Sequence, residues 1–156
     1  MSNWFTGSGE TIEFEEIVNI IESHSEQGGH VYVGSDSFLS KKDCTFSTAI
    51  CLHAADGQSG GRYFIKRNKF DPKLYENLIQ RITAEVKNSI DIGLKLIDLC
   101  PEIKIELHLD VSSSEKNTKT SKFSDMLVGY ANGSGFECKI KPMAFAATSI
   151  ADKHSK

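Results

Sequence analysis

One long stripe of apolar residues in the middle of the chain constrains the fold more than any other feature. Its members recur at spacings of three and four, which is the spacing of one face of an α-helix. They are Leu74, Leu78, Ile82, Val86, Ile90, Leu94 and Ile97. Asp71 and Pro72 precede the stripe as a capping carboxylate and a first-turn proline, and Pro101 follows it. The pattern predicts a long amphipathic helix with one packed face.

Segments with the pattern of β-strands lie on both sides of this helix. Residues 103–111 alternate between apolar and polar side chains, as a half-buried strand does. Before the helix, residues 30–37, 44–53 and 62–67 are separated by polar or glycine-containing turns. These three segments predict an antiparallel meander. A fifth strand is expected at residues 136–141.

Three further helices are expected, at about residues 11–25, at about 121–132, and from about Phe145 to the C-terminus. The element order is then helix, three strands, helix, strand, helix, strand, helix. This order predicts an α/β fold with one mixed five-stranded sheet, three antiparallel strands first, and helices on both faces. The length fits a single domain over residues 1–156, with residues 1–10 as an irregular arm.

Composition limits the function classes. The net charge of −3 gives no general attraction to nucleic acid, so binding would need a local basic face. There is no apolar run of membrane-spanning length and no signal-peptide pattern at the N-terminus, so we expect a cytoplasmic protein. The four cysteines lack the spacing of a zinc site, and we expect free thiols, although the sequence does not exclude disulfides.

Acidic residues are placed at several of the predicted elements. Asp36 is near the end of the first strand of the meander, Asp110 near the end of strand 103–111, Glu85 on the flank of the long helix, and Asp152 in the last helix. We expect the four carboxylates to meet and to hold a divalent metal ion, since ions such as Mg²⁺ prefer oxygen ligands.

Each of these residues also has a simpler interpretation. Asp36 and Asp110 could bind backbone amides in turns. Glu85 could pair with Arg81 on the helix surface, and Asp152 could be a solvated helix residue near a frayed end.

A series of short fragments, in order along the chain, carries a family resemblance. They are Val33-Gly-Ser-Asp-Ser37, Arg81-Ile-Thr-Ala-Glu85, His108-Leu-Asp-Val111, Gly129-Tyr-Ala-Asn-Gly133, Gly135-Phe136, Lys141-Pro142 and Ala151-Asp-Lys153. Through them the chain resembles the ribonuclease H-like YkuK family from about the first helix onward. The resemblance implies the ribonuclease H-like fold and the use of a carboxylate cluster to bind two Mg²⁺ or Mn²⁺ ions.

By position, the resemblance implies that Asp36 bridges both metal ions and that Glu85, Asp110 and Asp152 complete the catalytic site. The chain departs from many ribonucleases H, because no histidine lies between Asp110 and Asp152. His154 follows the last aspartate instead. The missing histidine argues against cleavage of an RNA strand in particular more than it argues against nuclease activity in general.

Candidate substrate contacts come from a polar turn and from one histidine. Lys116, Lys119 and Lys122 lie among hydroxyl residues just before a predicted helix, where lysines and helix-start amides suit phosphate. An ordinary solvated loop is the alternative. His108 shares a face with Asp110 and could contact substrate, or could be a structural histidine. Aromatic residues are not interleaved with these charges, so base stacking is not indicated.

The sequence therefore predicts a two-metal-ion nuclease, a phosphodiester hydrolase acting on nucleic acid. The alternative is a non-catalytic nucleic-acid-binding or scaffold module that retains the fold. A nucleotide-phosphate enzyme of the actin-like type is disfavoured, because the chain is too short and lacks a P-loop. The type of nucleic acid and the oligomeric state stay open.

Overall fold

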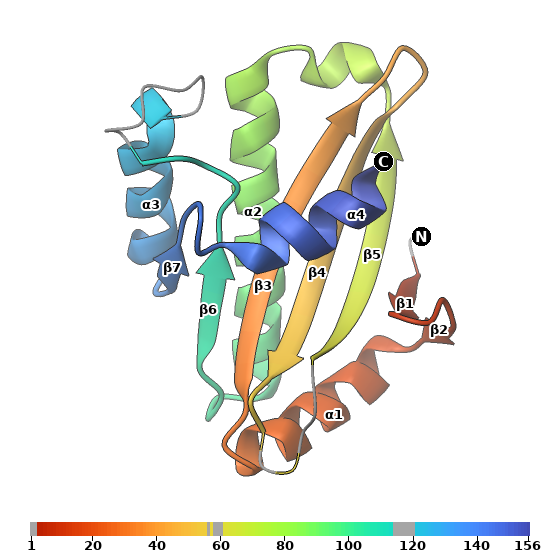
Figure 1. Ribbon diagram of the computed structural model, residues 1–156, viewed down its shortest axis with the longest axis vertical. Helices are drawn as coiled ribbons and strands as arrows, with labels where there is room; N and C mark the ends of the chain where they lie inside the picture. The colour runs from red at the N-terminus through yellow and green to blue at the C-terminus, as the bar shows by residue number, and fades with distance from the viewer. Residues whose placement is uncertain (1–2, 56, 58–60, 114–120) are drawn as a thin grey trace.

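The computed structural model describes residues 3–55, 57, 61–113 and 121–156. Seven strands form one mixed sheet in the order β2-β1-β5-β4-β3-β6-β7 (Figure 1). The strands are β1 (Trp4–Thr6), β2 (Thr11–Ile12), β3 (His30–Leu39), β4 (Cys44–His53), β5 (Arg62–Phe70), β6 (Ile105–His108) and β7 (Glu137–Lys139). The pairs β3–β6 and β6–β7 are parallel, and the remaining pairs are antiparallel.

Helices cover both faces of this sheet (Figure 1). They are α1 (Phe14–Glu26), the 3-10 helix η1 (Pro72–Tyr75), α2 (Leu78–Leu99), the 3-10 helix η3 (Ser121–Phe123), α3 (Ser124–Gly133), the π-helix η4 (Ala146–Ala151) and α4 (Asp152–Ser155). On one face, α1 and α2 pack against the larger hydrophobic core. On the other face, η4 and α4 cross the sheet and bury a smaller cluster around Ala49, Cys51 and Ile65. No helix among the described residues is both long enough and apolar enough to cross a membrane.

The sheet has seven strands rather than the five expected, because the N-terminal segment is not an irregular arm. Trp4 is buried and packs against Phe14, with ring centroids 5.9 Å apart. This anchor aligns β1 along β5, and β2 then pairs with β1. The helix expected from Thr11 consequently begins at Phe14. Strands of two and three residues are too short to show a periodic pattern.

The long helix starts later than its proline suggested. Asp71 accepts a hydrogen bond from the Lys73 amide, but the capped segment is only the short helix η1. The long helix α2 has its own cap, since the side chain of Asn77 accepts from the amides of Ile79 and Gln80. The apolar stripe within α2 is buried as expected at Ile82, Val86 and Ile90.

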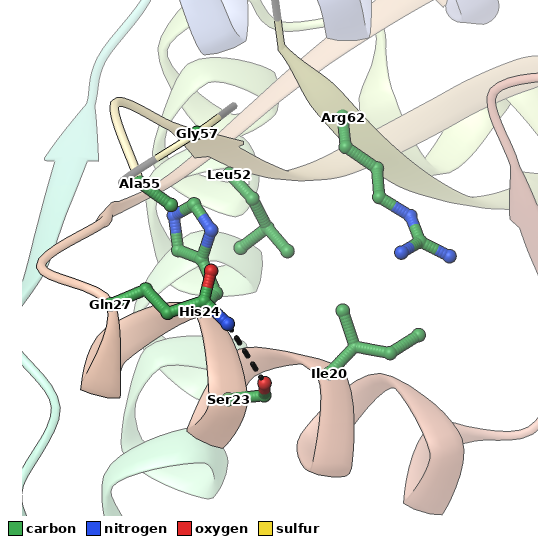
Figure 2. Close-up of a pocket in the computed structure, with 8 residues that line it drawn as sticks. All are labelled: Ile20, Ser23, His24, Gln27, Leu52, Ala55, Gly57 and Arg62. Atoms are coloured by element: carbon green, nitrogen blue, oxygen red, sulfur yellow. Dashed lines mark hydrogen bonds between the residues drawn. The ribbon is translucent and has the colours of Figure 1, made fainter. Parts of the chain in front are cut away.

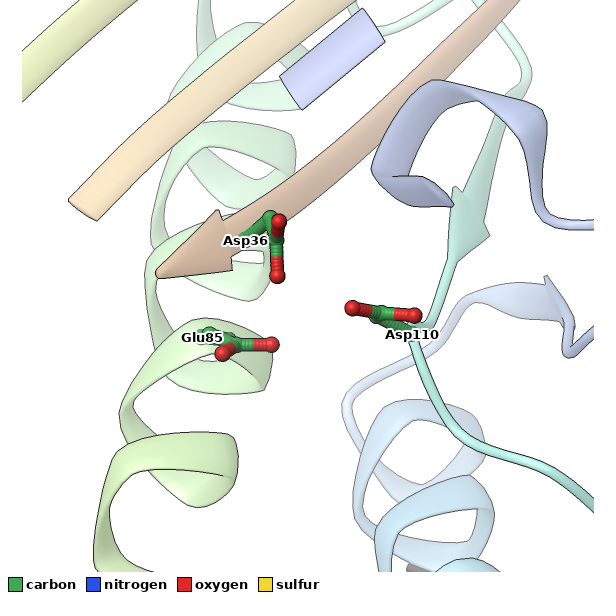
Figure 3. A group of neighbouring side chains, drawn as sticks. All are labelled: Asp36, Glu85 and Asp110. Carbon is green, nitrogen blue, oxygen red and sulfur yellow. The ribbon is translucent and has the colours of Figure 1, made fainter. Parts of the chain in front are cut away.

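The strand β3 is longer than its neighbour β6, and the candidate site lies where β3 extends past β6. The parallel pairing of β3 with β6 ends at Gly34 and His108, while β3 continues to Leu39. The expected strand 103–111 is thus shorter as a paired strand than its pattern indicated. Beyond Gly34 the edge of β3 has no strand partner on this side and faces α2 and the segment that follows β6. Asp36, Glu85 and Asp110 point toward one another there, and we call this place the acidic notch (Figure 3).

Candidate metal centre

Three carboxylates converge in the notch beside β3. Asp36 comes from β3, Glu85 from α2, and Asp110 from the segment after β6 (Figure 3). One oxygen of each lies within 4.8 Å of the others. Asp36 and Glu85 are both 6% exposed, and Asp110 is partly exposed. Three oxygen ligands on three separate elements give a more rigid arrangement than a single loop would.

Asp36 lies inside its strand rather than at the strand's end. It pairs in register with Ser47 of β4, and strand alternation directs its side chain to the face covered by η4 and α4. There the hydroxyl of Ser155 donates a hydrogen bond to Oδ2 of Asp36 at 3.3 Å. The neighbouring Ser35 and Ser37 point to the opposite face, where they bond Ser89 and Glu85 of α2.

Glu85 is directed into the notch and away from solvent. The hydroxyl of Ser37 donates to Oε2 of Glu85 at 2.5 Å. The surface alternative, a pair with Arg81, is not what the structure shows, because Nη1 of Arg81 donates to the carbonyl of Tyr75 at 3.0 Å. No Arg81–Glu85 ion pair occurs among the described residues.

Asp110 is held by ladder bonds that continue past the end of β6. The amide of Leu109 donates to the carbonyl of Lys139, and the amide of Lys141 donates to the carbonyl of Val111. Leu109 and Val111 are buried on the opposite side, so Asp110 points outward into the notch. Nζ of Lys141 lies 2.9 Å from Oδ1 of Asp110.

Asp152, the fourth expected carboxylate, lies at the rim of the cluster. It is the first residue of α4, and its side chain interacts with that of Asp36. It is 37% exposed, and Nζ of Lys156 lies 3.0 Å from its Oδ1. It does not belong to the group of three whose oxygens all lie within 4.8 Å of one another. The structure thus brings all four predicted residues together, three of them closely.

The pKa values reflect the crowding of these groups. Burial, followed by the nearby Asp110 and Asp152, raises the pKa of Asp36 to about 8. Burial and the charge of Asp36 raise the pKa of Glu85 well above its ordinary value. The pKa of Asp152 is lowered, chiefly through its interaction with Asp36 and then by Lys156. The carboxylates therefore oppose one another's ionisation, and a bound cation would relieve this repulsion.

The donor set fits a hard divalent cation. All the converging atoms are carboxylate oxygens, which Mg²⁺ and Mn²⁺ prefer, and a few carboxylates suffice for ions that keep some of their waters. Two lysines, Lys141 and Lys156, supply positive charge at the same place. Sequence reasoning missed both as charge partners. Lys141 could have been found, since the ends of the parallel strands β6 and β7 must lie at one edge.

His108 takes a structural position. It is 2% exposed, its Nδ1 accepts from the amide of Ala146 at 3.1 Å, and its Nε2 lies 3.0 Å from Oε1 of Glu106. The ring stacks on Tyr32 and contacts the edge of Phe145. With both ring nitrogens engaged, His108 anchors η4 to β6, as the structural alternative describes, and its contact with substrate stays a prediction.

The predicted basic turn is only partly covered. Lys116 and Lys119 lie outside the described residues. Lys122 is exposed in η3, with Nζ 5.7 Å from the centre of the Phe123 ring. Their role in phosphate binding stays a prediction. His154 lies 3.1 Å from the hydroxyl of Tyr63, on the sheet face that α4 covers.

A hollow of about 360 Å³ lies elsewhere, between α1 and the strands β4 and β5 (Figure 2). Its lining includes Ile20 and His24 of α1, Leu52 of β4 and Arg62 of β5. None of its described lining residues carries a carboxylate, and Nε2 of His24 is already bonded to the carbonyl of His30. Because its described lining offers no carboxylate that could bind a metal ion, we place the candidate site at the acidic notch.

Comparison with protein-family models matches residues 13–156 to the family described as Ribonuclease H-like. The resemblance to the YkuK family is consistent with this match. Neither the curated proteins nor the solved structures contain a match to the chain.

Proposed function

We propose that this chain, which belongs to the ribonuclease H-like family, is a divalent-metal-dependent nuclease that hydrolyses phosphodiester bonds in nucleic acid. The observation that carries the proposal is the meeting of Asp36, Glu85 and Asp110 at one notch, each from a different element. Asp36 and Glu85 are nearly buried there despite their mutual repulsion. Such an arrangement costs stability unless a cation compensates it.

The residues divide the work as follows. Asp36, Glu85 and Asp110 would hold the metal, with Asp152 at the rim. Bound metal ions supply an activated water and stabilise charge on the leaving oxygen. Ser37 holds the carboxylate of Glu85 in place, and Ser155 does the same for Asp36. Lys141 and Lys156 lie where a phosphate would approach, and each can exchange its carboxylate partner for a phosphate oxygen.

A second candidate function is a non-catalytic nucleic-acid-binding or scaffold module. The ion pairs of Lys141 with Asp110 and of Lys156 with Asp152 favour it. Each lysine compensates one carboxylate of the cluster, so the fold does not depend on metal for charge balance there. In this case the carboxylates of the acidic notch are present without taking part in any reaction.

The deciding experiment is a cleavage assay on labelled single-stranded DNA, single-stranded RNA, duplex DNA and hybrid, with Mg²⁺, Mn²⁺ or EDTA. The variants are Asp36→Asn and Asp110→Asn, with Asp98→Asn as an exposed acidic control on α2. We expect metal-dependent cleavage that both site variants abolish and the control retains. Cleavage that persists in the combined variant Asp36→Asn/Asp110→Asn would refute the proposed site. Binding of nucleic acid without any product supports the second candidate.

A further inference from the structure

Two rows of side chains lie next to each other on the sheet face that carries Asp36. In the nearer row, Asp36 of β3, Ser47 of β4 and Arg67 of β5 are directly opposite one another. In the next row, two residues further along β3, the aligned residues are Phe38, Thr45 and Lys69. Residues opposite each other in a ladder point to the same face, and so do residues two apart in a strand.

The outer row is exposed at both ends, at Phe38 and Lys69, while Thr45 between them is buried. Figure 1 shows η4 and α4 crossing the sheet, while β3 and β4 continue past them toward their connecting turn. Phe38 is 42% exposed. Its ring has no aromatic partner among the described residues, whereas Phe46, Phe70 and Tyr75 form a mutual cluster on the opposite face.

The exposed ring is accompanied by positive charge. Arg67 and Lys69 are both exposed, and neither forms an ion pair within the described part of the chain. A single exposed phenylalanine is ordinary on a protein surface. What distinguishes Phe38 is its position, with two free cations on the same face and the carboxylate of Asp36 in the adjoining row.

We propose that this surface, the Phe38 face (Phe38, Arg67 and Lys69), binds a single-stranded segment of nucleic acid. One base stacks on the Phe38 ring, and the adjacent phosphates lie against Arg67 and Lys69. Base stacking on aromatic rings combined with a cationic backbone track is the general mode of single-strand binding. The inference rests on the proposed nuclease function and narrows its substrate class to strands with unpaired bases beside the scissile bond.

Charge and geometry select this occupant over two others. A duplex keeps its bases stacked on each other, so it offers Phe38 no free base face. A second copy of the chain packed symmetrically on this surface would bring Arg67 and Lys69 against their own counterparts, and like charges repel. The sequence alone did not indicate stacking, because Phe38 and these cations belong to different strands and meet only through the register of β3, β4 and β5.

The test is fluorescence anisotropy in EDTA, where no strand is cut, with labelled single-stranded oligonucleotides of DNA and RNA and a blunt duplex of the same sequence. The variants are Phe38→Ala, Phe38→Trp and the double variant Arg67→Ala/Lys69→Ala. Matched controls are Met126→Ala, another exposed apolar residue, and Lys104→Ala, an exposed lysine before β6. Thermal melts verify that each variant is folded.

We expect Phe38→Ala to weaken single-strand binding about tenfold, to leave duplex binding unchanged, and Phe38→Trp to restore affinity. The double variant should weaken binding of every probe. The slope of log affinity against log salt concentration should fall by an amount that corresponds to roughly one to two phosphate contacts. An effect of Phe38→Ala below twofold, an equal loss for duplex, or no binding of any strand by the wild-type protein would overturn the proposal.

The outcome is separable from that of the nuclease assay. If Asp36→Asn still binds single strands in a Phe38-dependent way and the wild-type protein cuts nothing, the Phe38 face stands and the nuclease function fails. If metal-dependent cleavage occurs but Phe38→Ala binds and cuts single strands normally, the nuclease function stands and the Phe38 face fails.

Discussion

In the acidic notch, the ionisation of Asp36 is opposed both by burial and by the neighbouring carboxylates. Its raised pKa means that above about pH 8 the folded protein holds a buried charge that the unfolded chain would hold in water. We expect Asp36→Asn to raise the melting temperature in EDTA above that pH, since it removes this charge. The same variant should lose the rise in melting temperature that Mn²⁺ gives the wild-type protein.

The control for this experiment is Asp98→Asn, an exposed aspartate of α2. It should leave both the melting temperature in EDTA and the Mn²⁺ effect unchanged. A lower melting temperature of Asp36→Asn in EDTA would contradict the assignment, because it would mean that the ionised carboxylate stabilises the fold.

Lys141 competes with metal for Asp110. The pair is partly exposed, with side chains 41% and 20% accessible, so we expect Lys141→Ala to cost at most about 1 kcal/mol of unfolding free energy in EDTA. Removing the competing ammonium should lower the Mn²⁺ concentration needed for half of the melting-temperature shift. Lys139→Ala, which alters an exposed lysine of β7, is the neighbouring control. A higher Mn²⁺ requirement in Lys141→Ala would show that the lysine supports metal binding.

At the scale of single residues, the sequence pointed to the carboxylates better than to their partners. Asp36 and Asp110 could be recognised because each interrupts or closes an apolar strand pattern. Ser155 could not, since its contact with Asp36 depends on where the last helix returns to the sheet, and Lys141 could be found only by taking β6 and β7 as parallel neighbours. His108 had two open interpretations, and only the packing around its ring favours one of them.

The packing of α2 against the segment that leads into β7 depends on a glycine. A Cβ placed on Gly93 would lie 2.8 Å from Cζ of Phe136, whose side chain is buried. We expect Gly93→Ala to destabilise the protein by about 1–3 kcal/mol, although alanine favours helix, because the ring cannot move freely in a packed core. Chemical denaturation of both proteins measures the difference.

Gly129 provides the matched control, since it lies within α3 and a Cβ there would meet no atom within 4 Å. Gly129→Ala should stabilise the protein by roughly 0.5–1 kcal/mol through helix propensity alone. If both alanine variants are stabilising, the close approach of α2 to Phe136 is not a constraint. Adding Phe136→Leu to Gly93→Ala should recover part of the loss.

Helices and strands long enough for the apolar pattern to repeat several times were predicted well. Elements whose extent depends on pairing with a neighbouring strand were not. The boundaries of β4 agree with its predicted range, because a long hairpin strand is bounded by its own turns. β6 ends early because pairing requires a partner that stays alongside, and β3 and β6 separate after Gly34 and His108. β1 exists through its pairing with β5, which no local pattern records.

For the whole molecule, the clustering of carboxylates should make the unfolding free energy depend on pH. The raised pKa values of Asp36 and Glu85 mean that folding takes up protons, so the metal-free protein loses stability as the pH rises toward about 8. Other groups act outside the window from pH 7 to pH 8. The lowered pKa values of His108 and His154 affect stability below about pH 6.5, and the raised thiol pKa values of Cys51 and Cys100 affect it above about pH 8.5.

Between pH 7 and pH 8 we therefore expect the unfolding free energy in EDTA to fall by about 1 kcal/mol per pH unit, as measured by urea denaturation. In saturating Mn²⁺ the fall should vanish or reverse, because the metal takes the place of the bound protons and its affinity grows as they leave. Asp36→Asn should show a flatter dependence in EDTA for the same reason. A stability that rises over this window in EDTA would mean that the carboxylates ionise without cost in the folded protein, and the electrostatic argument for a metal centre would then fail.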